Sequence, residues 1–159
     1  MDSLDTTGLD IDQHPGFAIR RLHQISVGIF LQAVGDLGVT PVQYAALRVV
    51  AQQPGIDQRT LARAIALDTS TTGGVVDRLE ARGWLERRLS PDDRRARQLF
   101  LTPEGQQGLA DTLPGVQRSQ EQVLAPLTPR QRIEFMRLLR LLVTQNNELS
   151  RAPGGEAAR

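Results

Sequence analysis

The apolar positions of residues 69–82 recur with the period of an α-helix, and the polar residues between them point to water. Val75, Val76, Leu79 and Ala81 supply the apolar side. Gly83 follows directly, as glycine often does just past the end of a helix. The next two stretches, 84–89 and 97–101, are short and are separated by a turn-forming Ser-Pro-Asp-Asp run. The pattern therefore predicts a helix over 69–82 followed by a two-stranded ribbon.

Helices are also predicted on both sides of this unit. The patterns indicate a helix over 15–36, a second over 41–53, a short third beginning at residue 57, a long one over 103–124 and a last one over 129–149. Thr40, Asp57, Thr102 and Thr128 are the expected N-caps, and a proline follows each threonine at the first helical position. Pro114 and the glycine after it lie inside the long helix and predict a bend or break near residue 113.

The first and last helices carry more apolar surface than one side of a surface helix needs. In the first, apolar residues cover more than half of the circumference: Phe17, Ile19, Leu22, Ile25, Ile29, Phe30, Ala33, Val34 and Leu37. In the last, residues 138–143 are apolar nearly all round. Such faces need burial against a second surface besides the chain's own domain. We therefore expect a homodimer in which these two helices form the interface.

The order of elements over 41–102 is typical of a winged helix. A short helix, a tight turn at residues 67–68 and a second helix make a helix-turn-helix, and the ribbon that follows is the wing. The expected fold class is mainly α with a small two- or three-stranded β-wing. One domain is expected over 14–150, with dimerisation helices over 15–37 and 103–149 and the winged helix over 41–102. Residues 1–13 and 151–159 have no apolar pattern and are expected to be disordered.

Composition and charge narrow the range of functions. The 159 residues carry a net charge of +1 and include no cysteine, which excludes disulfides and thiolate chemistry. No apolar run approaches the roughly 18 residues of a membrane span, and the N-terminus is acidic, the reverse of a signal peptide. Positive charge concentrates on the ribbon, where Arg87, Arg88, Arg94, Arg95 and Arg97 outnumber Glu86, Asp92 and Asp93. This distribution favours a nucleic-acid partner over a membrane.

Catalysis is not expected. The chain has two histidines, and neither is spaced with carboxylates as metal ligands are. The sequence contains neither a Gly-rich phosphate loop nor a nucleophile elbow. We therefore expect no enzyme activity, no cofactor and no metal. A helical dimeric interaction module without DNA binding is the alternative class. It accounts for the wide apolar helices but leaves the basic ribbon without a role.

Three runs carry a resemblance to a known family: DRLEARGWLERR over 77–88, DDRRAR over 92–97 and LTPEG over 101–105. Together they resemble the signature of MarR-family transcriptional regulators, and the flanking helices agree in length and order. The resemblance implies a cytoplasmic bacterial regulator that binds double-stranded DNA as a homodimer on a pseudo-palindromic site. Repression is the expected output, because a dimer across a promoter blocks polymerase.

The resemblance places the DNA contacts on two elements. The helix over 69–82 starts with small residues only, so its backbone can approach DNA closely, and an arginine-rich wing tip can enter a minor groove. The expected DNA-binding residues are Ser70, Thr71, Thr72, Gly73, Gly74, Arg78, Arg94, Arg95 and Arg97. Without the resemblance, residues 69–74 are the ordinary start of a helix, and the wing arginines are part of a solvated loop. Asp93 is expected to brace a wing arginine rather than to touch DNA.

Residues 14–25, HPGFAIRRLHQI, resemble the start of family members that control aromatic-acid catabolism. The resemblance implies an anionic effector, an aromatic carboxylate such as a hydroxybenzoate or an aryl-CoA thioester, bound between the dimer helices and the DNA-binding part. Arg20, His23 and Ser26 succeed each other at i, i+3 and i+6 and so line one side of a helix. The expected ligand-binding residues are Phe17, Arg20, Arg21, His23, Ser26, Phe30, Tyr44 and Arg48. Two alternatives stay open: His23 and Ser26 hydrogen-bond across the dimer, or the regulator has no ligand.

Overall fold

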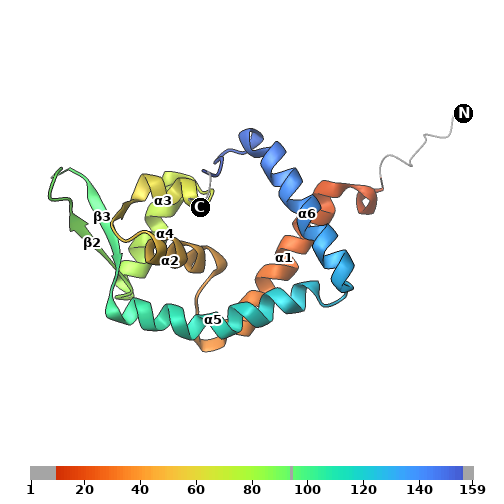
Figure 1. Ribbon diagram of the computed structural model, residues 1–159, viewed down its shortest axis with the longest axis horizontal. Helices are drawn as coiled ribbons and strands as arrows, with labels where there is room; N and C mark the ends of the chain where they lie inside the picture. The colour runs from red at the N-terminus through yellow and green to blue at the C-terminus, as the bar shows by residue number, and fades with distance from the viewer. Residues whose placement is uncertain (1–9, 94, 156–159) are drawn as a thin grey trace, which may run out of the picture.

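The computed structural model describes residues 10–93 and 95–155 as a mainly helical chain with a small sheet (Figure 1). The helices are α1 (Pro15–Val34), α2 (Pro41–Gln52), α3 (Gln58–Ala64), α4 (Thr69–Ala81), α5 (Pro103–Leu124) and α6 (Pro129–Gln145). The strands are β1 (Ile56–Asp57), β2 (Leu85–Leu89) and β3 (Arg97–Leu101). Three 3-10 turns complete the order: η2 (Ile11–Gln13), η3 (Gly35–Leu37) and η4 (Asn147–Leu149). The expected disorder of residues 1–9 and 156–159 falls outside the described residues.

The expected fold class is confirmed. The helices α2, α3 and α4 with the sheet form a winged helix at one end of the molecule, and α5 runs from it to the end that holds α1 and α6 (Figure 1). The winged helix has its own core. Its completely or almost completely buried side chains include Leu47, Leu61, Leu79, Leu85 and Leu99. Burial of these apolar side chains holds α4 and the base of the wing in one rigid unit.

The sheet is antiparallel, with β3 between β1 and β2. Leu85 of β2 lies opposite Leu101, and Leu89 lies opposite Arg97, as expected for the ribbon. The third strand is β1, in which Ile56 pairs with Leu99. The apolar pattern marks Ile56 only as the residue before a helix cap, because a two-residue strand has no period of its own.

The expected N-caps are present. Thr40 and Thr128 each form a capping box with the glutamine three residues on. Asp57 and Asp68 cap α3 and α4 with their carboxylates and without a capping box. Each carboxylate accepts one bond from a backbone N–H and one from a threonine hydroxyl, of Thr60 at 2.9 and 2.6 Å and of Thr71 at 2.8 and 2.6 Å. The two helices of the helix-turn-helix therefore start on identical local structures.

Of the expected bend or break near residue 113, the break is wrong, and the bend stays a prediction. The helix α5 is continuous over 22 residues with Pro114 inside it. It packs mainly along α1, and a Cβ on Gly115 would stand 2.6 Å from the carbonyl oxygen of Ala33. At its other end, Cβ atoms on Gly105 and Gly108 would overlap Trp84. The glycines therefore permit close packing, which outweighs the hydrogen bond that proline removes.

The apolar faces of α1 and α6 are open. The helix α6, all of whose residues are described, has none that is buried. Its exposed apolar residues are Ile133, Leu138, Leu139, Leu141, Leu142 and Val143, and those of α1 are Ile19, Leu22, Ile25 and Leu31. Within the described residues no single helix is long and apolar enough to cross a membrane, although α1 with η3 and α2, bent by 69°, pass that test as a pair by length and composition.

The C-terminal part differs from the expectation in two ways. The helix α6 ends at Gln145, and η4 follows it where the apolar pattern predicts helix up to residue 149. Residues 151–155 are not a loose tail. They lie against the end of α3, where Gly155 N donates to Arg63 O at 2.9 Å. A tail without an apolar pattern can still be placed by backbone hydrogen bonds, which sequence periodicity does not report.

Candidate nucleic-acid interface

The first turn of α4 presents only part of the set expected from the sequence. Ser70 is exposed. Thr71 is exposed too, but its hydroxyl donates to the capping carboxylate of Asp68 at 2.6 Å. Thr72 is completely buried, and its hydroxyl donates to the carbonyl oxygen of Asp68 at 2.8 Å. The assignment of Thr72 to the DNA-facing residues is therefore corrected, because its side chain belongs to the core.

The two glycines of α4 have different surroundings. A Cβ on Gly73 would stand 3.1 Å from Nε2 of Gln58, so this position is close to α3. A Cβ on Gly74 would meet no described atom within 4 Å. A glycine inside a helix costs roughly 1 kcal/mol relative to alanine. Packing within the protein accounts for Gly73, whereas the described part of the chain offers no such reason for Gly74.

The wing tip exposes its cations. Arg95 and Arg97 are exposed, and Arg94 lies outside the described residues. Asp93 does brace this loop, although through the backbone: its carboxylate accepts from Arg95 N at 2.9 Å, and its carbonyl accepts from Ala96 N at 3.0 Å. This turn leaves the described arginine side chains of the tip free of acidic partners within the described residues.

Arg87 connects the wing to the helix-turn-helix. Its guanidinium donates to Asp77 at 2.6 Å, to Glu80, and to Oε1 of Gln58 at 3.3 Å. Gln58 in turn donates from Nε2 to the carbonyl oxygen of Thr69 at 3.5 Å. Burial lowers the pKa of Arg87, but the hydrogen bonds and charges of Asp77 and Glu80 outweigh burial and raise the pKa overall. The cation therefore stays charged between β2, α3 and α4.

In the sequence, Arg87 is one of several ribbon arginines, and its role as a connection between elements is not predicted. A signal is present, because Arg87 is two residues from the buried Leu85 and therefore projects from the same face of the strand. Arg78, which is on the expected list, is exposed and has no ion pair within the described residues. Glu80, two residues further along the helix, pairs with Arg87. Arg78 is thus available for a phosphate group.

The structure brings together only some of the residues expected to bind a ligand. The rings of Phe30 and Tyr44 lie with centroids 6.0 Å apart, in a small cluster with Val34 and Val116. Arg48, one turn beyond Tyr44 on α2, is half-buried.

The other expected ligand residues have local partners or face solvent. The guanidinium of Arg20 lies 5.1 Å from the ring of Phe17, and the hydroxyl of Ser26 donates to the carbonyl oxygen of His23 at 2.9 Å. His23 and Arg21 are exposed in the single chain. Within the described residues no buried side-chain nitrogen or oxygen lacks a partner. The hydroxyl proton of Ser26 therefore already has a partner within its own helix.

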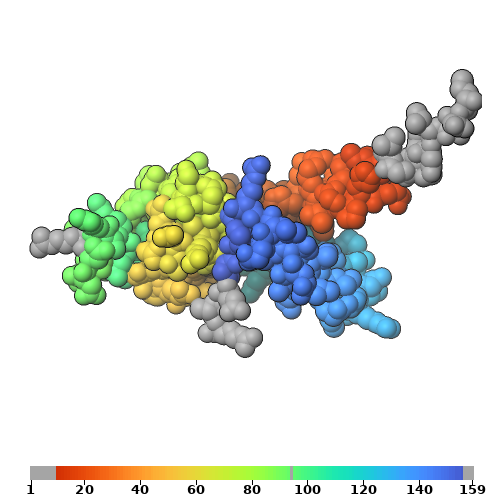
Figure 2. Space-filling view, turned by 90° about the horizontal axis from the view of Figure 1, so that it is seen from above, coloured from red at the N-terminus to blue at the C-terminus, as the bar shows by residue number. Residues whose placement is uncertain are grey.

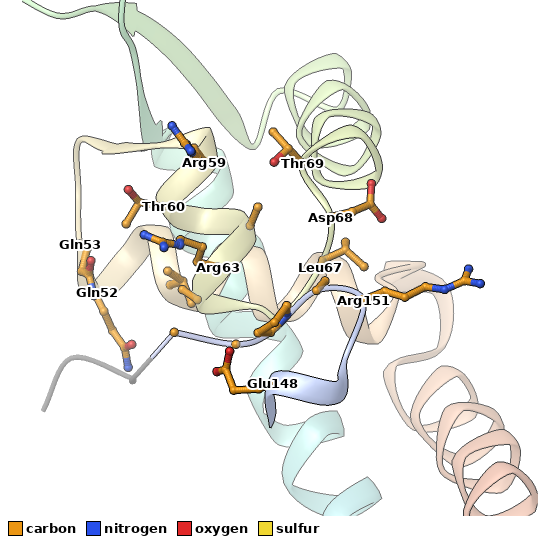
Figure 3. A pocket seen from close by; sticks show the side chains of 17 residues that line it. Gln52, Gln53, Arg59, Thr60, Arg63, Leu67, Asp68, Thr69, Glu148 and Arg151 are labelled. Atoms are coloured by element: carbon orange, nitrogen blue, oxygen red, sulfur yellow. The ribbon is translucent and has the colours of Figure 1, made fainter. Parts of the chain in front are cut away.

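A cavity of about 950 Å³ lies in a different place, between the end of α2, α3 and the C-terminal segment (Figure 3). Thr60, Arg63, Gln52 and Glu148 are among its lining residues. None of the residues expected to bind a ligand lines it. The aromatic cluster at Tyr44 and this cavity are separate features.

Comparison with known proteins agrees with this geometry. A model described as the MarR family matches residues 37–96. A protein described as a transcriptional regulator of the hcr operon of Thauera aromatica is 37% identical over 134 residues, which are 84% of this chain and 81% of that protein.

Two solved structures extend the similarity to the fold. BpsR of Bordetella bronchiseptica, whose DNA binding is regulated by 6-hydroxynicotinic acid, is 30% identical with a TM-score of 0.77 over 82% of this chain and 93% of that chain. The transcriptional repressor CouR, solved on a 23-mer DNA duplex, is 26% identical with a TM-score of 0.79 over 89% of this chain and 99% of that chain.

Proposed function

Because this chain belongs to the MarR family of transcriptional regulators, we propose that it is a homodimeric repressor that binds a pseudo-palindromic operator. We further propose that a small aromatic carboxylate, or a related anion such as an aryl-CoA thioester, releases it from DNA. The relatives support both parts: CouR is solved on DNA, and 6-hydroxynicotinic acid regulates the DNA binding of BpsR.

The observation that carries the DNA-binding part is the open first turn of α4. Ser70 is exposed there, and one turn further on a Cβ on Gly74 would meet no described atom within 4 Å apart from the backbone of its own helix. A helix with such a start brings its backbone close to base edges and phosphates. The exposed Arg95 and Arg97 supply cations on the wing. Such cations are attracted by the strongly negative potential of a narrow minor groove. Arg94 at the tip stays a proposed contact on the basis of sequence.

The open apolar faces support the dimer. Leu142 of α6 is 54% exposed and Ile25 of α1 is 49% exposed in the single chain. Several such side chains on two helices form an apolar surface of the kind that marks an interface. A second copy buries the same faces by two-fold symmetry, which also places two α4 helices about one DNA turn apart.

The effector part rests on the cluster between α1 and α2. Phe30 and Tyr44 offer an apolar wall with a phenol, and the half-buried Arg48 offers a guanidinium for a carboxylate. Arg20, Arg21 and His23 line the exposed part of α1, where a partner subunit would cover them. A ligand releases the protein only if it binds the DNA-incompetent state more tightly.

The experiment is a gel-shift measurement with promoter fragments selected from the source genome. We expect retention at low salt and a steep loss of affinity as salt rises. The variant Arg95→Ala/Arg97→Ala should bind at least about tenfold more weakly, whereas Arg130→Ala/Arg140→Ala, on α6, should bind nearly as the wild type does. Failure to retard any fragment at low salt contradicts DNA binding and favours the interaction module.

The effector is tested by thermal shift with benzoate, hydroxybenzoates, 6-hydroxynicotinate and aryl-CoA thioesters. We expect one class to raise the melting temperature and to displace the protein from DNA. Arg48→Gln should weaken both effects, and Arg140→Gln is the matched control. If no anion stabilises the protein, a regulator without a ligand replaces this part of the proposal.

A further inference from the structure

The C-terminal segment, residues 150–155, returns from α6 to the helix-turn-helix of the same chain. In Figure 2 the dark blue end of the chain touches the yellow-green part that holds α3 and the start of α4. The carbonyl oxygen of Arg63, in the last turn of α3, accepts backbone bonds from Ala66 N at 3.2 Å and from Gly155 N at 2.9 Å. One acceptor therefore holds both the α3–α4 turn and this segment.

Asn147 closes the segment into a loop. Its Nδ2 donates to the carbonyl oxygen of Gly154 at 3.1 Å, and its Oδ1 accepts from Gly154 N at 2.9 Å. Both polar atoms of the amide are thus used on one residue seven positions later. This pair of bonds mimics a strand pairing and sets where Gly154 and Gly155 reach α3.

The segment contacts the α3–α4 turn at Ala66, which has a positive φ angle. Ala66 has φ +52°, a conformation that costs a residue with a Cβ roughly 1–2 kcal/mol. A Cβ on Gly154 would stand 3.4 Å from the Cβ of Ala66. The turn at Ala66 sets the angle between α3 and α4, so contacts on this turn bear directly on the direction of α4.

We propose that residues 150–155 are a strap that ties the end of α6 to the α3–α4 turn of its own chain and so holds α4 relative to the dimer helices. Asn147 is the positioning residue of this strap. The inference rests on the proposed function, because it concerns how two α4 helices keep the spacing that a pseudo-palindrome requires.

The strap makes few contacts with α3. The cavity of about 950 Å³ separates much of the strap from α2 and α3, with Arg63 and Glu148 on its walls (Figure 3). Gly155 makes the one backbone bond from residues 150–155 to α3 among the described residues. A segment with few contacts opens at low free-energy cost. The strap therefore adjusts the position of α4 without being part of the core.

A disulfide tests the contact directly. The chain has no cysteine, and Cβ atoms about 3.5–4.5 Å apart suit a disulfide. We expect Gly154→Cys/Ala66→Cys to form an intrachain bond rapidly on mild oxidation, detected by non-reducing mass analysis of the digest. Gly155→Cys/Ala66→Cys is the matched control and should oxidise more slowly, because the three atoms nearest a Cβ on Gly155 all belong to Arg63. Equal rates, or a covalent dimer instead of an intrachain bond, overturn the strap.

The positioning role is tested on operators whose half-sites are moved by one base pair. The oxidised Gly154→Cys/Ala66→Cys protein should discriminate against the altered spacing at least as well as the wild type. Asn147→Ala should reduce the ratio of affinities for the normal and the altered operator roughly fivefold. Asn146→Ala, which removes a bond to Leu142 O instead, should keep it. A purely structural role lowers stability without changing the ratio, and an unchanged ratio overturns the inference. Wild-type protein that binds no DNA contradicts the proposed function, while the oxidation result still reports on the contact.

Discussion

The guanidinium of Arg87 in β2 donates to the carboxylate of Asp77 in α4, with 2.6 Å between Nη2 and Oδ1. The same group reaches Glu80 and Gln58, so one side chain joins the wing base to both helices of the helix-turn-helix. Arg87 is only 19% exposed, which separates it from the solvated cations at the tip. The position of the wing relative to α4 therefore depends on this cation.

We expect Arg87→Ala to weaken DNA binding without abolishing the fold. Loss of the guanidinium frees the wing base from α4 and should cost about 1 kcal/mol of unfolding free energy. In gel shifts, Arg95→Ala should matter less in the Arg87→Ala background than in the wild type, because a loose wing no longer places Arg95. Arg88→Ala is the control, since Arg88 pairs with Glu86 and stacks on Phe100 within the sheet. Strictly additive effects of Arg87→Ala and Arg95→Ala would show that Arg87 does not place the wing.

Gly74→Ala should separate stability from DNA binding. Apart from the backbone of its own helix, no described atom would lie within 4 Å of the new Cβ, so the protein should gain up to about 1 kcal/mol of unfolding free energy in urea. The same methyl group should weaken operator binding, because the proposed function brings α4 close to DNA at this position. Gly108→Ala, where the methyl group would overlap the ring of Trp84, should instead destabilise the protein by about 1–3 kcal/mol. Unchanged operator affinity for Gly74→Ala would exclude close approach at this position.

Acid should weaken the helix-turn-helix through its two caps. Hydrogen bonds from the Thr60 and Thr71 side chains lower the pKa values of Asp57 and Asp68 below the ordinary 3.8. A lowered folded-state pKa contributes stability above 3.8, and this contribution is lost as the pH falls through the folded value. Asn still caps a helix but does not titrate. The urea midpoint of the wild type should therefore exceed that of Asp57→Asn/Asp68→Asn at neutral pH, and the difference should shrink between about pH 5 and about pH 3. A difference that stays constant over this range contradicts the assignment.

Leu142→Asp should convert the proposed dimer to a monomer. The charge falls on the open apolar face of α6, where a second copy would have to bury it. Arg140→Asp is the matched control, because a step of two residues turns about 200° around a helix and places it on the opposite side. Light scattering after size-exclusion chromatography measures both. A wild-type protein that is monomeric at micromolar concentration, or a Leu142→Asp dimer of unchanged stability, argues against α6 as the interface.

Much of the fold could be predicted from sequence because its signals are local. The caps at Thr40, Asp57 and Thr128 involve residues no more than three positions apart. The β3 strand and the helices are likewise recognised from the apolar pattern of neighbouring residues. The exposed first turn of α4 and the wing arginines follow from the same local patterns. The wide apolar arcs of α1 and α6 could likewise be identified before any packing was known.

Only the tertiary structure decided which residues distant in sequence contact one another. Thr72 precedes the buried Val76 and Leu79 by four and seven residues, so the helix period places it on the inward face, but only packing shows that it is completely buried. The continuity of α5 at Pro114 depends on α1 beside it, and the role of Arg87 depends on Asp77 ten residues earlier. The docking of Gly155 on Arg63 rests on a single backbone bond, which carries no side-chain pattern. Short-range hydrogen bonds and apolar periods can be predicted from a sequence, whereas these contacts arise only when packing brings separate elements together.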